Sequence, residues 1–161
     1  MGDKTIRIQI SENYAEIPGK QLRQTAILRW GRRGRKWLAK QIQGMRRDRF
    51  GFTSFYAFAL AGKKVVGFAY FCQDESDPAQ WYYGDLAVHK KHRRKGVATA
   101  IVEEGIRALK AKNAAKLFTY IDNGNGASLA FHQKLSFVRS ERQDPINGLL
   151  IDGGAVYERT L

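Results

Sequence analysis

The chain has 161 residues, of which 28 are Lys or Arg and 15 are Asp or Glu, so its formal net charge at pH 7 is +13. This length predicts a single folded domain over residues 1–161, because about 100 to 200 residues form one hydrophobic core. No apolar run approaches the roughly 20 residues that cross a bilayer, and the start MGDKTIRIQI lacks the apolar core of a signal peptide. We therefore expect a cytoplasmic protein with no membrane partner.

Hydrophobic periodicity predicts an alternation of strands and helices along the chain. The helical pattern over residues 15–48 is interrupted at Gly31 and Gly34, which indicates two helices. Gly62 and Lys63 separate two β-rich runs and are typical of a hairpin turn. The predicted elements are strand 5–10, two helices within 15–48, strands 54–61, 64–72 and 81–88, helix 97–113, strand 116–121, helix 127–135, and strands 137–143 and 155–161. This order implies an α/β protein with a mixed sheet and helices on its faces.

The positive charge is concentrated in two parts of the sequence. Between Lys20 and Arg49 there are 11 basic residues and one acidic residue, so this basic stretch alone carries +10. It also contains Trp30 and Trp37, and basic residues interleaved with aromatic ones can bind nucleic acid through phosphate contacts and stacking. The alternative is a solvated helix face with both Trp side chains in the core. The second cluster lies between residues 90 and 95, where five of six residues are Lys or Arg.

The segment from Asp85 to Ala98 joins a predicted strand to a predicted helix through that second basic cluster. A helix N-terminus presents unpaired amides and the positive end of the helix dipole. Gly96 lets the backbone approach a ligand closely, and the small side chain of Ala98 leaves room over the first turn. These features favour a phosphate or diphosphate site, and the alternative is an ordinary connection with solvated cations. A Walker loop is excluded because no GKS or GKT sequence follows, and the dinucleotide fingerprint lacks its three glycines.

Two segments together resemble a known family. The first consists of Arg93, Arg94, Lys95, Gly96, Val97 and Ala98, preceded by Leu-Ala-Val at 86–88. The second contains Asn125, Ser128, Leu129, Phe131, His132, Lys134, Leu135 and Phe137. They are similar to Arg/Gln-x-x-Gly-x-Gly/Ala and to Asn-x-x-Ala-x-x-Phe-Tyr-x-Lys-Leu-Gly-Phe of the GNAT family of acetyl-CoA-dependent N-acetyltransferases. The resemblance covers roughly residues 5 to 161.

The resemblance implies the GNAT fold, a mixed central sheet of about seven strands with helices on both faces. It implies that the strands predicted over 81–88 and 116–121 splay apart and hold the pantetheine arm of acetyl-CoA between them. Backbone groups of Leu86 and Val88 would pair with this arm, and the amides from Arg94 to Ala98 would hold the diphosphate. The Arg93 and Arg94 side chains would be salt partners of the diphosphate or simply solvated. Asn125 would contact the cofactor, cap the following helix, or do both.

The sequence departs from the family pattern at two positions, since His132 replaces a Tyr and Ser136 replaces a Gly. The Tyr often protonates the departing thiolate, and a His can supply that proton as a general acid. His132 alternatively forms a core hydrogen bond or supports the pantetheine. Asp85 is the candidate general base, with substrate orientation or loop capping as the alternatives. Tyr82 and Tyr83 are further candidates for shaping the acceptor pocket.

The lone Cys72 excludes an internal disulfide and a multi-Cys metal site, no metal is expected, and its apolar surroundings predict a buried structural thiol. We therefore predict an N-acetyltransferase that moves acetyl directly from acetyl-CoA to a primary amine of a small molecule or protein. The alternative function is an RNA- or ribosome-associated binding module on the same scaffold with little catalysis. Nucleic acid or another polyanion would then bind the basic stretch from Lys20 to Arg49. The sequence leaves open the acceptor amine and whether the chain forms a homodimer.

Overall fold

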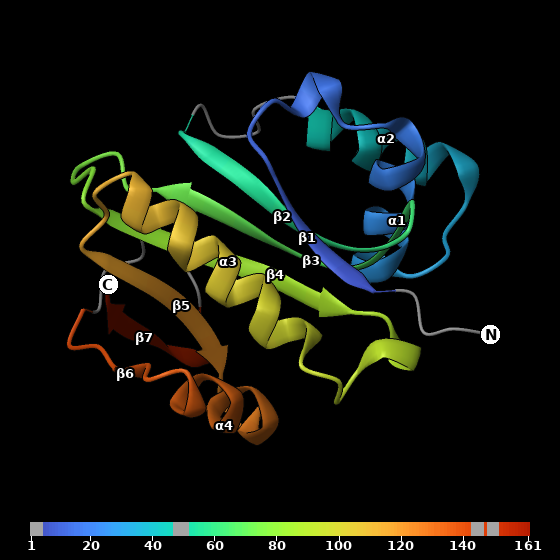
Figure 1. Cartoon of the computed structure of the whole chain (residues 1–161). Coiled ribbons are helices and arrows are strands. Elements are labelled where there is room, and N and C mark those ends of the chain that lie inside the picture. Colours follow the sequence, from blue (N-terminus) through green and yellow to red (C-terminus); the bar gives the residue numbers. More distant parts are fainter. Residues whose placement is uncertain (1–4, 47–51, 143–146, 148–151) are drawn as a thin grey trace.

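The computed structural model describes residues 5–46, 52–142, 147 and 152–161 (Figure 1). The elements follow each other in nearly the order that periodicity predicts. They are β1 (Ile6–Ser11), a 3-10 turn (Tyr14–Glu16), α1 (Gly19–Trp30), α2 (Arg35–Arg46), β2 (Ser54–Ala61), β3 (Lys64–Gln73), β4 (Gln80–Val88), a 3-10 turn (Lys90–His92), α3 (Val97–Ala111), β5 (Lys116–Asp122), α4 (Gly126–Lys134), β6 (Val138–Arg139) and β7 (Gly154–Thr160). No helix within these ranges is long and apolar enough to cross a membrane.

One sheet of seven strands runs through the molecule in the order β1-β2-β3-β4-β5-β7-β6. All neighbouring strands are antiparallel except β4 and β5, which are parallel. Helix α3 connects these two parallel strands, as a crossover connection requires. The predicted mixed sheet of about seven strands is confirmed.

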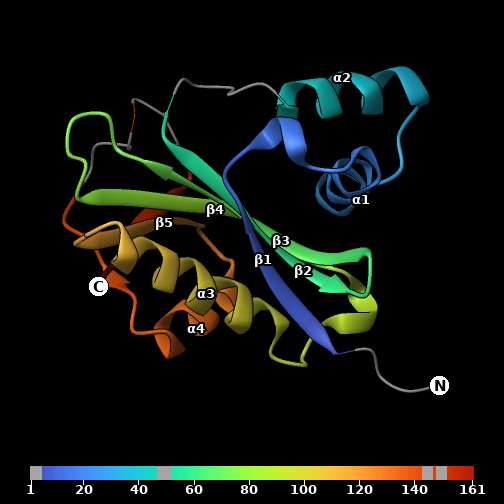
Figure 2. The same ribbon diagram turned by 45° about the horizontal axis from the view of Figure 1, so that its top comes forward.

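The helices cover both faces of the sheet, with α1 and α2 on one face and α3 and α4 on the other (Figure 2). Phe55 and Phe71 belong to the core beneath α3, whereas Phe58 and Phe68 belong to the core beneath α1 and α2. Strands that are buried on both faces carry apolar residues at every position rather than at alternate ones. This explains the continuous apolar run FYAFALA from Phe55 to Ala61 in β2.

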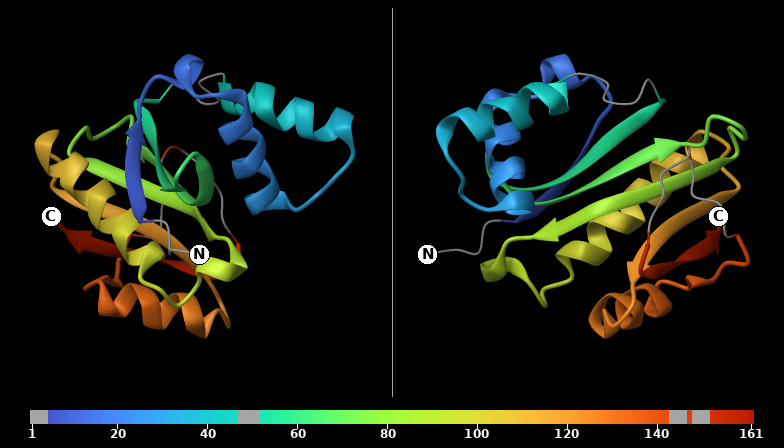
Figure 3. Two further views of the ribbon diagram at one scale, coloured as in Figure 1. Left: turned by 45° about the vertical axis from the view of Figure 1, so that its right-hand side comes forward. Right: turned by 180° about the vertical axis from the view of Figure 1, so that it is seen from behind.

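The parallel strands β4 and β5 separate after a short paired stretch. Residues 80–82 pair with residues 116–118, and beyond this point the two strands run apart (Figure 3). On its other side, β4 shifts register against β3, and the pairing skips Asp85 and Leu86. Asp85 has a φ of 60°, in the left-handed region that an Asp tolerates better than most residues. The extra residue forms a β-bulge, which bends a strand locally and re-aims its side chains. The predicted splay is therefore present.

The strand predicted over residues 137–143 was the largest error, because β6 spans only Val138–Arg139. It cannot begin earlier, since the amides of Leu135 and Phe137 both donate to the His132 carbonyl and so complete the end of α4. Beyond β6, Arg142 turns toward the β3–β4 loop, where its Nη2 lies 2.8 Å from Asp74 Oδ2. Position 143 lies outside the described residues.

One smaller difference concerns the start of a helix. The helical segment predicted from residue 15 starts instead at Gly19, after a 3-10 turn and Pro18, because Pro fixes a φ suited to a helix entry. Its predicted end at Asp48 lies outside the described residues. Ser136, which stands where the GNAT pattern has Gly, has a φ of 64°, a conformation that glycine adopts with less strain.

Candidate active site

A cavity of about 400 Å³ lies where β4 and β5 separate, and most of the site residues predicted from the sequence line it. They come from β4, from the loop and first turn of α3, and from α4: Asp85, Leu86, Val88, Arg93, Ala98, Asn125 and His132. The other predicted residues, Arg94 to Val97, form the turn that leads into Ala98 and do not line this cavity. The two sequence segments that resemble the family thus meet at one place.

The turn before α3 has the geometry of an anion site. Gly96 caps α3 with a φ of 76°, and no side chain bonds to this helix end. Within the described part of the chain, the amides of Val97, Ala98 and Thr99 donate to no acceptor. A Cβ at Gly96 would meet nothing within 4 Å, so the space above the turn is open. These amides and the helix dipole together favour a bound phosphate.

Arg93 makes a structural contact that the sequence did not predict, and its role toward a diphosphate stays a prediction. Its Nε donates a hydrogen bond of 2.9 Å to the carbonyl of Val88, which ties the loop to the end of β4. The same strand end pairs with Gly67 of β3. The Val88 carbonyl therefore already has a partner, whereas Leu86 is skipped by the β3 pairing and faces the fork cavity. Of the two positions predicted to pair with a pantetheine arm, Leu86 is the better placed.

His132 lies buried at the wall of the cavity with both ring nitrogens in hydrogen bonds. Its Nδ1 lies 2.7 Å from the Ser128 carbonyl, and since a carbonyl only accepts, Nδ1 carries the proton. In the neutral ring Nε2 then accepts, and its partner is the hydroxyl of Tyr83. Burial lowers the pKa of His132, and the bond to Ser128 opposes this shift only in part. The neutral imidazole is therefore the resting form.

Tyr83 is a site residue whose position the sequence did not predict. It was expected beside Tyr82 on the acceptor side, but neighbouring residues of a strand point to opposite faces. Tyr83 lies in the core beneath α3, and burial raises the pKa of its hydroxyl. The signal that could have placed it is the alternation of Trp81 and Tyr83 with Tyr82 along β4.

Asp85 lines the cavity and forms an ion pair that the sequence did not reveal. Its Oδ2 lies 2.5 Å from Nη1 of Arg29 in α1. The guanidinium of Arg29 also lies over the ring of Trp30, 4.5 Å from its centroid. Arg29 was predicted only as one of many charges in the basic stretch, because no local pattern links a helix residue to a strand residue so far along the chain.

Asn125 and Cys72 adopt roles that were among those expected. Asn125 Oδ1 accepts a hydrogen bond of 3.1 Å from the Ser128 amide, so it caps α4, and it also lines the cavity. Cys72 is buried in β3, and burial raises the pKa of its thiol to about 12. The thiol is therefore protonated at neutral pH and is no nucleophile.

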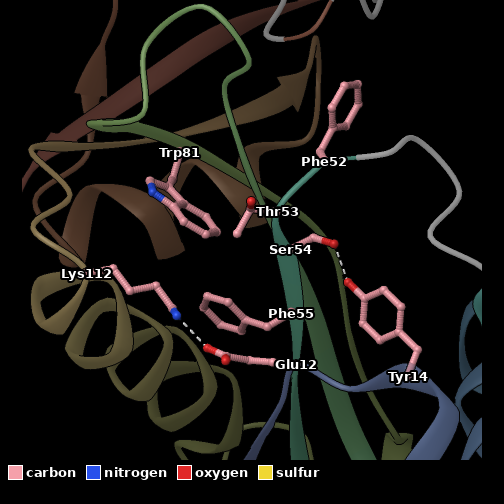
Figure 4. A pocket seen from close by; sticks show the side chains of 8 residues that line it. All are labelled: Glu12, Tyr14, Phe52, Thr53, Ser54, Phe55, Trp81 and Lys112. Carbon is pink, nitrogen blue, oxygen red and sulfur yellow. Dashed lines mark hydrogen bonds and ion pairs between the residues drawn. The ribbon is translucent and has the colours of Figure 1, made fainter.

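A second cavity, of about 300 Å³, lies at the opposite end of β4, beside Trp81 (Figure 4). Among its lining residues, Lys112 and Glu12 form an ion pair of 2.6 Å, and the Tyr14 hydroxyl forms a hydrogen bond with Ser54. None of the site residues predicted from the sequence lines this cavity. The fork cavity is therefore the candidate active site.

Comparison with known proteins gives a family match over most of the chain. Residues 20–137 match the sequence model of the Acetyltransferase (GNAT) family. Mycothiol acetyltransferase from Corynebacterium glutamicum is 27% identical over 84 residues, which are 52% of this chain and 28% of that protein. The chain thus aligns with little more than a quarter of the length of this relative.

Solved structures share the fold at low sequence identity. A GNAT acetyltransferase from Staphylococcus aureus Mu50 matches with a TM-score of 0.71 and 13% identity, over 97% of this chain and 99% of that one. The PaiA N-acetyltransferase from Thermoplasma acidophilum, solved in complex with coenzyme A, matches with a TM-score of 0.64 and 14% identity, over 98% of this chain and 99% of that one.

Proposed function

This chain belongs to the GNAT family of acetyltransferases, and from that premise we propose that it transfers acetyl from acetyl-CoA directly to a primary amine. The proposal is supported by one observation: the cavity between β4 and β5 lies next to the N-terminus of α3. The cavity there continues to Ala98, and the unpaired amides of the α3 N-terminus follow immediately. A ligand with a diphosphate at one end and an extended arm at the other fits this arrangement.

The residues of the fork fit acetyl-CoA as the co-substrate. The amides from Arg94 to Ala98 would hold the diphosphate, together with the charges of Arg93 and Arg94. The backbone of Leu86 would form hydrogen bonds with the pantetheine arm. Val88 would do so as well, through the second lone pair of its carbonyl, which already accepts one hydrogen bond from Arg93. Asn125 would lie beside the arm while it caps α4. Acetyl-CoA supplies an activated thioester carbonyl to this site.

The acceptor nitrogen forms a bond to the acetyl carbon as the carbon–sulfur bond breaks, giving an amide and the thiol of CoA. An ammonium acceptor loses two protons in this reaction. We assign Asp85 as the base that takes the first proton and passes it to solvent. The second proton of the ammonium is balanced by the proton that the sulfur of CoA gains. The overall reaction therefore releases one proton.

We propose Tyr83 as the general acid that protonates the thiolate, and His132, the acid expected from the sequence, as the residue that returns a proton to Tyr83. Neutral His132 has no proton on Nε2, because that nitrogen accepts from the Tyr83 hydroxyl. The Tyr83 hydroxyl would give its proton to the thiolate, and His132, after taking a proton from solvent, would return one to Tyr83. Both residues then end in their starting states. Such a positioned acid contributes about 10² to 10⁴ in rate.

The test is release of free CoA thiol during incubation with acetyl-CoA and a panel of amines. The panel contains amino acids, polyamines, aminoglycosides and peptide N-termini, and mass spectrometry identifies the acetylated product. We expect thiol release above the amine-free background with at least one acceptor. Tight binding of acetyl-CoA without any acetylated product would contradict the enzyme and favour the binding module.

A second function is favoured by the arrangement of the basic stretch. Arg33 lies over the ring of Trp37, 5.1 Å from its centroid, and Trp37 contacts Trp30 edge to face. In such an arrangement the exposed Arg side chains can contact phosphates and the half-buried Trp rings can stack on bases, as in proteins that bind single-stranded nucleic acid. The polyanion partner, the single domain over 1–161 and the cytoplasmic location stay predictions from the sequence.

A further inference from the structure

Arg29 and Asp85 place opposite charges side by side at the acceptor side of the fork. Arg29 belongs to α1 and Asp85 to the bulge of β4, and the two head groups touch at 2.5 Å. Asp85 lines the fork cavity, whereas Arg29 is not among the lining residues and reaches the site through its contact with Asp85. The Arg29 and Asp85 side chains remain 34% and 27% exposed. Asp85 is the sole carboxylate among the described residues that line the cavity.

From this pair we infer that the acceptor is a zwitterion whose ammonium and carboxylate groups are neighbours, namely a free α-amino acid. The inference rests on the proposed function, since it assigns the acceptor of that same site. The ammonium would bind Asp85 and the carboxylate would bind Arg29.

Charge complementarity distinguishes this acceptor from a simple amine. A lone ammonium that approaches Asp85 also meets the positive charge of Arg29, and like charges repel. A carboxylate next to the ammonium turns that repulsion into attraction. Because the two protein groups are in contact, the two ligand charges must also lie close together, as they do in an α-amino acid.

The ion pair need not break when such an acceptor binds. An Arg side chain carries five N–H donors, and the contact with Asp85 is made by Nη1. The remaining donors can bind a carboxylate, which matches the planar guanidinium well. A carboxylate has about four lone-pair sites, so Asp85 can accept from more than one donor at a time.

Tyr82 lies next to this charge pair. A Cβ added to Gly84 would lie 2.8 Å from the Tyr82 hydroxyl oxygen, so this hydroxyl lies over the residue before Asp85. Burial raises the pKa of Tyr82, Asp85 raises it further and Arg29 opposes the shift, as expected for a hydroxyl beside the pair. Tyr82 pairs with Phe118 at the last joined position of β4 and β5, so the charge pair and the fork are adjacent.

The experiment compares each amino acid with the amine that lacks its carboxylate. L-phenylalanine is paired with phenethylamine and L-lysine with cadaverine, and 4-aminobutyrate represents a zwitterion with distant charges. We expect the KM of the amino acid to be at least tenfold lower than that of its amine and of 4-aminobutyrate. In Arg29→Gln the KM of the amino acid should rise about tenfold, while the KM of the amine stays the same or falls.

Two controls separate charge loss from misfolding. Lys110→Gln removes one charge from an exposed position of α3 on the other face of the sheet and should change neither KM. Arg29→Lys keeps the positive charge but loses the planar set of guanidinium N–H donors. Its affinity for the amino acid should therefore lie between those of Arg29→Gln and the wild type. The shift in Tm on addition of acetyl-CoA reports whether each variant retains its fold.

Amino acid binding to the CoA-bound protein is also measured by calorimetry, which needs no turnover. Equal or better use of the amines would overturn the zwitterionic acceptor and leave the acetyltransferase standing. Binding of the amino acids that depends on Arg29, without any acetylated product, would support the site and contradict acetyl transfer. If no amino acid binds and no amine reacts, both proposals fail.

Discussion

The Tyr83 hydroxyl and His132 Nε2 form a buried hydrogen bond between β4 and α4, although the residues lie 49 positions apart in the sequence. His132 Nδ1 donates its proton to the Ser128 carbonyl, so Nε2 of the neutral ring must accept. This fixes the direction of the hydrogen bond to Tyr83. Tyr83 donates and His132 accepts. The two residues therefore form one unit, and the phenol stands beside the cavity on β4 while α4 carries the imidazole.

Removal of either partner should slow turnover while acetyl-CoA still binds. We expect His132→Phe and Tyr83→Phe each to lower kcat by about 10² to 10⁴, with the affinity for acetyl-CoA within a few fold of wild type. The double variant should be little worse than either single one, because groups that act as a unit are not additive. Steady-state kinetics with Tyr157→Phe as a matched control would test this. Wild-type rates in His132→Phe would leave that residue a packing role alone.

The stability of the fold should fall as the pH drops below about 6.5, the ordinary pKa of His. Burial lowers the pKa of His132 in the folded state, so the unfolded chain binds the proton at a higher pH than the native protein does. Stability is therefore full above about pH 6.5 and is lost as the pH falls toward the lower native pKa. Urea unfolding at intervals between pH 7 and 5 measures the slope. The slope should become flatter in His132→Gln, and an unchanged slope would contradict the assignment.

Acetyl-CoA should stabilise the fold through the turn at Gly96. At 100 times its Kd the ligand adds about 2.7 kcal/mol, which corresponds to a rise in Tm of roughly 5 to 10 °C for a chain of this size. Gly96→Asp should abolish this rise, because it adds a negative charge at the diphosphate site. Gly96→Asn is the matched control, because Asn must adopt the same positive φ as Asp and has a similar size, but carries no charge. Equal loss in both variants would mean that backbone strain and not charge is responsible.

A polyanion, if it binds the basic stretch, should reveal itself by salt dependence. Arg32, Arg33 and Arg35 are exposed in and beside the α1–α2 connection. Replacing all three with Ala should flatten the slope of log affinity against log salt by about two units, since each contact to a single strand contributes about −0.7. Acetyl-CoA binding should stay unchanged because the α3 turn is separate. Equal RNA affinity of the triple variant and the wild type at every salt concentration would leave the charge a solubility feature.

The contact of α3 with the sheet requires a glycine. A Cβ at Gly105 would lie 2.2 Å from the Phe71 ring, so Gly105→Ala must displace a fully buried aromatic side chain. We expect a loss of about 1 to 3 kcal/mol in the free energy of unfolding, despite the better helix propensity of Ala. Gly126→Ala in the first turn of α4 meets nothing within 4 Å and should be neutral or stabilising by about 0.4 to 1 kcal/mol. Urea unfolding of both variants gives the comparison.

Local signals in the sequence predict most of the elements, and they single out residues from two segments that the fold places around one cavity. The turn residues Gly62 and Lys63 predict the β2–β3 hairpin because two adjacent residues set its geometry. Gly96 and the basic loop likewise predict the anion site, since a helix N-terminus presents its amides whatever lies around it. The end of β6 was not predictable in this way, because Arg142 leaves the sheet to meet Asp74 in another loop.

The reactive contacts were decided only by the tertiary structure. Nothing near Arg29 in the sequence indicates that it will meet Asp85, and nothing near Tyr83 indicates that it will bond to His132. Each contact joins two elements whose relative position depends on the packing of helices on both faces of the sheet and on one extra residue in β4. A bulge and a fork are properties of strand pairing, and pairing is a relation between distant segments that local residue patterns do not encode.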